Sequence, residues 1–249
     1  MIFYFSATGN TQWIAQRIAS STQDHLVSIV EASNAPTHYE LKEGERLGFI
    51  FPIHGWRVPT LVRHFIEHLD INSKGHFTYA VCTCGDDIGL ALDNFMPIHV
   101  DSAYSLRMPN TYVGLPFMDV DPKELQILKK SQTEQRLHVI MEEIYDKKKD
   151  IFRLDRGRFA SLKTHIIGGF FEKYLISDKP FHVDATKCVK CGICANVCPV
   201  GDILGGFGKM PEWQHTGECL TCFNCYHHCP HHAIEFGNRT KNKGQYYFK

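Results

Sequence analysis

The chain has 249 residues, 43% of them hydrophobic, which is enough for one large domain or two modest domains with real cores. Its 27 Lys and Arg residues equal its 27 Asp and Glu residues, so no overall field favours nucleic acid or an acidic lipid surface. No run of about 18 apolar residues occurs, which excludes an ordinary membrane-spanning helix. The chain opens on a strand-like MIFYF without the features of a signal peptide, so we expect a cytoplasmic protein.

The first two predicted elements are a strand over residues 2–5 and a helix that begins near Trp13. The loop between them, Ser6-Ala7-Thr8-Gly9-Asn10-Thr11, contains hydroxyl side chains and one glycine. Backbone N–H groups at such a loop and helix start, together with the hydroxyls, form an anion site. The loop lacks the Lys of a nucleoside triphosphate loop and contains no G-x-G-x-x-G fingerprint. It favours a monophosphate held by neutral donors, and the alternative is an ordinary capped turn.

Further strands and helices are expected to alternate along the next part of the chain. Strands are predicted over residues 26–30, 47–51, 76–83 and 102–112, and helices over 60–69 and 125–145. This alternation predicts a parallel sheet with helices on both faces. Ligands of such sheets bind at the carboxyl ends of the strands. The loops 52–59 and 84–89 each begin at the carboxyl end of a predicted strand.

These features resemble flavodoxin, over roughly residues 1–150. S-x-T-G-x-T matches the flavodoxin phosphate loop, and the loops 52–59 and 84–89 match the pair that flanks the isoalloxazine ring. The resemblance implies a doubly wound α/β domain that binds FMN. It places Ser6, Thr8, Gly9, Asn10 and Thr11 at the phosphate, and His54, Gly55, Trp56, Cys84, Gly85 and Asp86 near the ring.

Three side chains near the expected flavin have competing interpretations. Trp56 is the aromatic best placed to stack on the ring, although it could instead be a core or interface residue. Leu90 follows the second loop, where an aromatic often stands. Cys82 and Cys84 point to one face of a strand, so dithiol redox chemistry beside a flavin competes with the favoured structural interpretation. Of these two cysteines, only Cys84 is expected near the flavin.

A connector is predicted over residues 151–180, after the basic run Lys147-Lys148-Lys149. Its basic stretch is typical of a solvated face. Apolar residues then recur at helical intervals, which predicts an amphipathic helix that packs this face against a domain. These residues are Phe159, Leu162, Ile166, Phe170 and Tyr174. The charges of Lys163, Glu172 and Lys173 argue against insertion across a bilayer but leave association with a membrane surface open.

The C-terminal part repeats one cysteine motif, C-x2-C-x2-C-x3-C-P, with identical internal spacing. The first copy is Cys188, Cys191, Cys194 and Cys198 before Pro199, and the second is Cys219, Cys222, Cys225 and Cys229 before Pro230. Two such motifs specify two [4Fe-4S] clusters, with each fourth cysteine carried to the other cluster. One cluster is therefore expected on Cys188, Cys191, Cys194 and Cys229, and the second on Cys219, Cys222, Cys225 and Cys198.

Zinc and disulfides are weaker interpretations of these cysteines. A zinc ribbon uses C-x2-C pairs that are separated by a longer loop, and four thiolates complete its tetrahedral site. Each motif here instead places three cysteines in consecutive C-x2-C steps and a fourth shortly after, which does not match that arrangement. Disulfides would need an oxidising compartment. His227, His228, His231 and His232 crowd the second motif, and we expect them to form a solvated or partner-facing surface.

The cysteine region resembles the bacterial two-cluster ferredoxins over roughly residues 181–236. The whole chain resembles the family of flavodoxin-ferredoxin fusion proteins, which implies an FMN domain over 1–150 and a small α+β two-cluster ferredoxin-like domain with a C-terminal tail over 181–249. The link between Cys198 and Cys219 is long for a two-cluster ferredoxin. We expect it either to cover a cluster or to touch the flavin domain.

The function expected from these resemblances is electron transfer between the two clusters and FMN, with redox proteins as donor and acceptor. No catalytic residue is assigned, and an electron carrier is favoured over a substrate-specific enzyme. The alternative is an FMN-dependent oxidoreductase that reduces a small molecule with electrons fed through the clusters. His54 and Arg57 would then be candidate proton donors, although each is more often a loop side chain facing water. A colourless structural zinc protein is a third possibility.

Overall fold

The structure, a computed structural model, describes residues 1–33 and 38–248. Its chain forms two compact units. Two short segments, Ala7–Gly9 and Asn110–Pro122, belong to the C-terminal unit although their neighbours in sequence belong to the N-terminal unit. The N-terminal unit comprises Met1–Ser6, Asn10–Pro109 and Lys123–Gly169. The C-terminal unit comprises Ala7–Gly9, Asn110–Pro122 and the chain from Phe170 onward.

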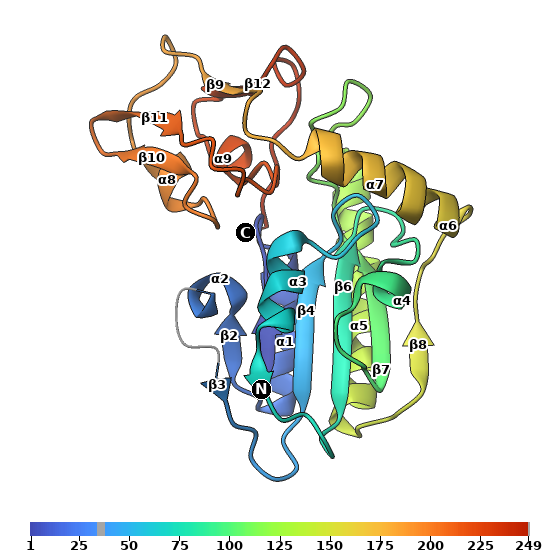
Figure 1. The fold of residues 1–249 in the computed structure, drawn as a ribbon. Helices are drawn as coiled ribbons and strands as arrows, with labels where there is room; N and C mark the ends of the chain where they lie inside the picture. The colour runs from blue at the N-terminus through green and yellow to red at the C-terminus, as the bar shows by residue number, and fades with distance from the viewer. Residues whose placement is uncertain (34–37, 249) are drawn as a thin grey trace. The chain divides into compact units, whose positions relative to one another are not determined.

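A parallel sheet forms the centre of the N-terminal unit (Figure 1). Within the described residues it has six strands in the order β2-β1-β4-β6-β7-β8. These strands are β1 (Ile2–Tyr4), β2 (Leu26–Ser28), β4 (Leu47–Pro52), β6 (Thr78–Cys84), β7 (Ser102–Arg107) and β8 (Ile151–Arg153). A separate short parallel pair joins β3 (His38–Tyr39) to β5 (Asp70–Ile71).

Helices cover both faces of this sheet, as the alternation of elements predicts. Figure 1 shows α1 and α5 packed together on one face, and α3 and α4 on the other. The helices are α1 (Asn10–Thr22), α2 (Ile29–Ala32), α3 (Thr60–Glu67), α4 (Ala91–Phe95) and α5 (Lys123–Tyr145). Every residue of β6 is buried because the strand is covered on both faces, which explains its unbroken apolar and small side chains. The predicted doubly wound α/β fold is confirmed.

Two details of the sheet differ from the expected strands. The strand expected over residues 26–30 ends at Ser28, whose side chain accepts a hydrogen bond from the backbone N–H of Glu31 and caps α2. The sixth strand, β8, lies in the basic stretch expected to be a solvated face, and it pairs in parallel with β7. Its three residues are too few for a recognisable alternation.

Residues 160–175, the connector helix, are helical as predicted, but the exposed face is the opposite of the expected one. The segment runs through α6 (Ala160–Leu162), η1 (Lys163–Ile167), α7 (Gly168–Phe170) and η2 (Phe171–Leu175), of which η1 and η2 are π-helical. The apolar residues Phe159, Leu162, Ile166, Phe170 and Tyr174 are 70%, 47%, 65%, 55% and 59% exposed. Its buried residues are Thr164 and Gly168, which are small and belong to the N-terminal unit, and Phe171, which belongs to the C-terminal unit. Small residues let the backbone approach its neighbours closely, so they form the packed face.

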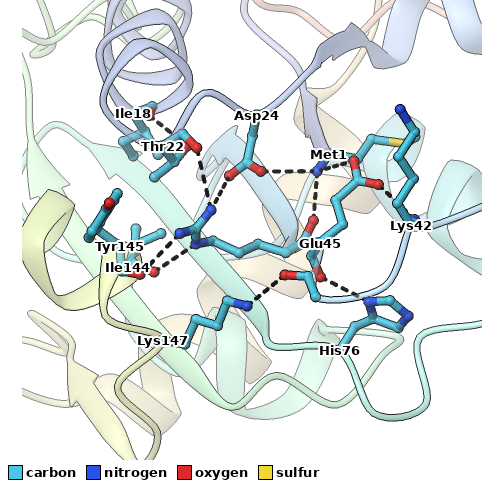
Figure 2. Close-up of polar contacts among 12 residues, drawn as sticks. Met1, Ile18, Thr22, Asp24, Lys42, Glu45, His76, Ile144, Tyr145 and Lys147 are labelled. Carbon is cyan, nitrogen blue, oxygen red and sulfur yellow. Dashed lines mark hydrogen bonds and ion pairs between the residues drawn. The ribbon is translucent and has the colours of Figure 1, made fainter.

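Arg46, immediately before β4, contacts the ends of two helices in the N-terminal unit. Figure 2 shows its partners Thr22, Asp24, Ile144 and Tyr145. Its guanidinium donates to the carbonyl oxygens of Ile144 at 3.1 Å and Tyr145 at 3.0 Å, near the end of α5, and to that of Thr22, at the end of α1, at 3.4 Å. It also pairs with Asp24 at 3.5 Å. The Arg46 and Asp24 side chains are only 13% and 6% exposed. A buried cation thus satisfies carbonyls that helices leave unpaired at their C-terminal ends.

The C-terminal unit is small and rich in short strands, in line with the expected α+β architecture. Strands β9 (Phe181–Val183) and β12 (Ile234–Phe236) pair antiparallel, as do β10 (Ile203–Gly206) and β11 (Lys209–Trp213). Two helices, α8 (Ile193–Asn196) and α9 (Asn224–His227), each contain the third cysteine of one motif, Cys194 and Cys225. Aromatic rings form the core: Phe181 stacks on Trp213 at 5.5 Å and meets Phe236 at 4.7 Å.

One of the four histidines expected at the surface lies in the interior of this unit. His227 is buried, its Nε2 lies 2.7 Å from the carbonyl oxygen of Thr111, and its Nδ1 accepts from the backbone N–H of Tyr246. Burial lowers the pKa of His227 to about 4, so its imidazole is neutral at pH 7. His231 and His232 are exposed, as expected. Among the described residues, no helix is both long and apolar enough to cross a membrane.

Candidate cofactor sites

The candidate phosphate loop connects β1 to α1, as expected. Within the N-terminal unit, the Oγ of Ser6 is buried and has no hydrogen-bond partner among the described residues. Leaving such a hydroxyl unsatisfied is costly, so a ligand with acceptor oxygens fits this position. Asn10 donates through Nδ2 to the carbonyl oxygen of Pro109 at 3.0 Å, and Thr11 shares a 2.8 Å hydrogen bond with Thr83. These two side chains therefore fix the loop against β6 and the chain after β7.

Thr8 and Gly9 of the same loop belong to the C-terminal unit and contact the end of the chain. The backbone N–H of Phe248 donates to the carbonyl oxygen of Thr8 at 2.8 Å. Gly9 has a φ of +92°, and a Cβ built there would lie 3.0 Å from the Cβ of Phe248. Both features favour glycine, because other residues rarely adopt this conformation and a Cβ would crowd Phe248.

The two loops expected to flank the flavin ring lie against each other in the N-terminal unit. The indole N–H of Trp56 donates to Oδ1 of Asp87 at 2.9 Å, and the backbone N–H of Gly89 donates to the same oxygen at 3.3 Å. Trp56 itself has a φ of +59°, which few residues other than glycine adopt. The loops are thus joined through one carboxylate, and stacking of Trp56 on a flavin stays a prediction.

The connector helix supplies further contacts to both loops, and no pattern in the sequence predicts these contacts. Lys163 pairs with Asp87, and its Nζ lies 5.7 Å from the centre of the Trp56 ring. Thr164 accepts from the backbone N–H of Leu90 at 2.8 Å, and its carbonyl oxygen accepts from Nε of Arg57 at 3.1 Å. These partners are more than 70 residues apart, and their pairing leaves no local pattern. The helix therefore fixes the edge of the candidate flavin site.

The remaining candidate residues near the ring have distinct surroundings. Burial lowers the pKa of the half-buried His54 to about 4, so its imidazole is neutral at pH 7. Cys84 is buried at the end of β6 with its Sγ 3.8 Å from the carbonyl oxygen of Leu106, and burial raises the pKa of its thiol to about 12. The carbonyl oxygen of Gly85 accepts from Lys129 at 2.8 Å, and the Asp86 side chain is 93% exposed.

Cys82 shares the buried environment of Cys84 within β6. Its Sγ lies 3.4 Å from the carbonyl oxygen of Tyr104, and burial raises the pKa of its thiol. Both cysteines are free thiols. Protonated, buried sulfurs that point at backbone carbonyls match the structural interpretation of this pair better than dithiol redox chemistry.

Two cavities in the C-terminal unit each bring together four cysteines. The first cavity is lined by Cys188, Cys191, Cys194 and Cys229, and the second by Cys198, Cys219, Cys222 and Cys225. Each cavity thus receives three thiols from one motif and the fourth thiol from the other. These are the two sets that the crossed arrangement requires.

The geometry of the motifs explains how a short loop surrounds each cavity. Gly192 follows Cys191 with a φ of +78°, and a Cβ there would lie 2.9 Å from the backbone of Gly206. The long link between the motifs forms the β10-β11 hairpin, whose Pro211 lines the first cavity and whose Trp213 lines the second. The hairpin therefore covers both cavities, which is one of the two roles expected for it.

The cavities suit thiolate-bound clusters chemically. Burial raises the pKa of the Cys194 thiol to about 11 and those of Cys219 and Cys222 to about 12. Thiolates crowded in an apolar cavity need a positive partner, and iron supplies it by displacing the protons. Eight thiols divided between two enclosed cavities fit two cubane clusters.

Comparisons with known proteins identify two domain families in the chain. Residues 1–100 match the family described as a flavodoxin domain, and residues 181–230 match the family described as a 4Fe-4S dicluster domain. A solved structure assigned as a flavoprotein, from Bacteroides uniformis, is 18% identical over 43% of this chain and 88% of that chain, with a TM-score of 0.35. No curated protein sequence matches the chain. The expected flavodoxin domain near the N-terminus and the expected 4Fe-4S domain near the C-terminus are confirmed, the cofactors that they imply are FMN and [4Fe-4S] clusters, and an electron-transfer function is supported.

Proposed function

We propose that this chain, which joins a flavodoxin domain to a 4Fe-4S dicluster domain, exchanges electrons between two [4Fe-4S] clusters and FMN. The clusters transfer single electrons, and FMN can link one-electron and two-electron chemistry. The observation that carries the proposal is the sorting of eight cysteines into two cavities on a chain that also carries a flavin domain. A covalent tether keeps the cofactors at a high effective concentration, so they need not meet by free diffusion.

The residues proposed to hold the cofactors follow from the sites described above. The first cavity would hold one cluster and the second cavity the other, in the crossed arrangement. Ser6, Thr8, Gly9, Asn10 and Thr11 would surround the FMN phosphate with backbone and hydroxyl donors. His54, Gly55, Trp56, Cys84, Gly85 and Asp86 would lie near the ring. Redox proteins in the cytoplasm would serve as donor and acceptor.

An FMN-dependent oxidoreductase fed through the clusters is the alternative function. Such an enzyme needs a proton donor near the flavin, and His54 and Arg57 are the candidates from the sequence. His54 is neutral at pH 7, and Arg57 donates to the carbonyl oxygen of Thr164 and lies 4.6 Å from the Phe95 ring. Neither arrangement favours proton donation to a substrate, so electron transfer is the better-supported function.

The test of the proposed function compares flavin reduction in the parent protein and in a chain without clusters. In Cys191→Ala/Cys222→Ala each cavity loses one ligand, and FMN binding should be unaffected. We expect stopped-flow reduction of the flavin by a one-electron donor under anaerobic conditions to slow by a factor of about 100 or more, because the clusters are the entry point. The matched control is Cys82→Ala, which removes a buried cysteine outside both cavities.

Reduction of the flavin at the parent rate in the double variant would contradict electron entry through the clusters. Rapid turnover of a small-molecule acceptor by the parent, with no transfer to carrier proteins, would favour the oxidoreductase instead. FMN content measured after each preparation separates loss of electron transfer from loss of the flavin.

The phosphate loop leads to a separate prediction about FMN and riboflavin. Ser6→Ala removes the one hydroxyl of the loop that is buried without a partner, and FMN binding should weaken by about 1 to 3 kcal/mol if a charge-assisted hydrogen bond to phosphate is lost. Riboflavin has no phosphate, so its affinity should not change. Titration of the flavin-free protein followed by fluorescence measures both. Equal affinities of the parent for FMN and riboflavin would argue against a phosphate site here.

A further inference from the structure

The exposed side of the connector helix carries a row of large apolar side chains, which we call the apolar row: Phe159, Leu162, Ile166, Phe170 and Tyr174. Most amphipathic helices of globular proteins turn such residues toward the core. This helix does the reverse, because Thr164 and Gly168 occupy its packed side and contact Leu90 and the carbonyl oxygen of Gly55. The apolar row is therefore not explained by the folding of the N-terminal unit.

The π-helical turns keep this row on one side of the helix. Four of its residues repeat at every fourth position, whereas an α-helix has about 3.6 residues per turn, so the row would drift around a purely α-helical segment. The segments Lys163–Ile167 and Phe171–Leu175 close i→i+5 hydrogen bonds and hold more residues per turn. Alternating α and π turns match the four-residue repeat, and the Phe170 and Tyr174 rings lie 5.0 Å apart.

Positive charges stand at both ends of the row. The Arg158 guanidinium lies 5.5 Å from the centre of the Phe159 ring, and the Lys173 ammonium lies 5.1 Å from that of Tyr174. Both cationic residues are exposed. Residues 147–179 contain nine Lys and Arg against four Asp and Glu, in a chain whose 27 Lys and Arg as a whole equal its 27 Asp and Glu. Several of these cations pair with carboxylates of the sheet unit, whereas Arg158 and Lys173 flank the row itself.

We propose that the apolar row is an interfacial docking face for an anionic lipid bilayer surface. A helix that lies in the plane of a membrane interface buries one apolar side in the acyl boundary and places cations among the anionic headgroups. The row and its flanking cations have this composition. The Arg158 and Tyr174 ends would lie at the headgroup level, where amphipathic aromatic rings and cations are favoured. This proposal does not depend on how the cofactors exchange electrons.

The experiment measures binding of the full-length, cofactor-loaded protein to lipid vesicles. We expect co-sedimentation with phosphatidylcholine vesicles that contain about one-third phosphatidylglycerol, and weaker binding to phosphatidylcholine alone. Ile166→Ser should weaken the partition coefficient about tenfold or more, because it removes a side chain that enters the bilayer. Arg158→Glu/Lys173→Glu should weaken binding only to the anionic vesicles, and added salt should do the same.

The matched control is Phe207→Ser, in the turn of the β10-β11 hairpin. Phe207 is 94% exposed, so this variant removes a comparable apolar side chain outside the row and should bind vesicles like the parent. All the variant positions are exposed, so the flavin and iron contents should remain unchanged. Failure of the parent to bind anionic vesicles would overturn the proposal. So would a concentration-dependent dimer in light scattering that Ile166→Ser abolishes, because a second copy would then cover the row.

Discussion

Replacing Cys198 by Ala is expected to remove the cluster whose other three candidate ligands lie in the opposite motif. The second cavity combines Cys198 with Cys219, Cys222 and Cys225, although Cys198 follows the first motif's other cysteines in sequence. A [4Fe-4S] cluster with three thiolates is labile, so iron should fall from about eight to about four per chain, with sulfide falling in parallel. Anaerobic iron and sulfide analysis measures both.

The reciprocal variant sharpens this prediction. Cys229→Ala should remove the other cluster, which the first cavity assigns to Cys188, Cys191 and Cys194. Electron paramagnetic resonance of the reduced proteins should show a different remaining cluster in each variant. Paired variants identify the ligation: Cys198→Ala combined with Cys222→Ala should lose no more iron than either alone, because both act on one cluster. Loss of both clusters in that pair would instead indicate that each motif binds its own cluster. One zinc per motif with no sulfide would contradict iron-sulfur clusters altogether.

Arg46→Ala should destabilise the N-terminal unit by about 3 kcal/mol, because it leaves helix-end carbonyls without their donor and leaves Asp24 with only the N-terminal ammonium of Met1 at 3.6 Å. The Arg46 guanidinium contacts three carbonyl oxygens and Asp24, and a Lys offers only a single ammonium. We therefore expect Arg46→Lys to recover part of the loss. Urea unfolding followed by the far-UV helical signal measures the change.

A surface arginine provides the control for this variant. Arg17 on α1 is 49% exposed and lies 3.7 Å from Glu134, so its pair is solvent-screened. Arg17→Ala should cost less than about 1 kcal/mol. Equal losses in Arg17→Ala and Arg46→Ala would show that burial of the Arg46 network contributes nothing to stability.

The sequence by itself determined the cofactors, the fold class and the central elements of the N-terminal domain. The doubled cysteine motif is specific because cluster ligation imposes its spacing on consecutive residues, and a strand, a hydroxyl-rich loop and a helix start are equally local. Continuous apolar strands such as Leu47–Pro52 and Thr78–Cys84 were also recognisable, since burial on both faces requires apolar side chains along the whole strand.

The tertiary structure decided which residues meet across long separations and which side of a helix is covered. Helical periodicity located the connector helix, but the packed side was the side of Thr164 and Gly168, because close approach to the loops at Gly55 and Leu90 favours small residues over large ones. Strand β8 was missed because pairing with β7, and not its own sequence, makes it a strand. His227 was expected at the surface, yet a carbonyl from residue 111 satisfies its ring in the interior. The spacing of cysteines or apolar residues along the chain can be seen in the sequence. The partner that satisfies a buried polar group is determined only when distant segments fold together.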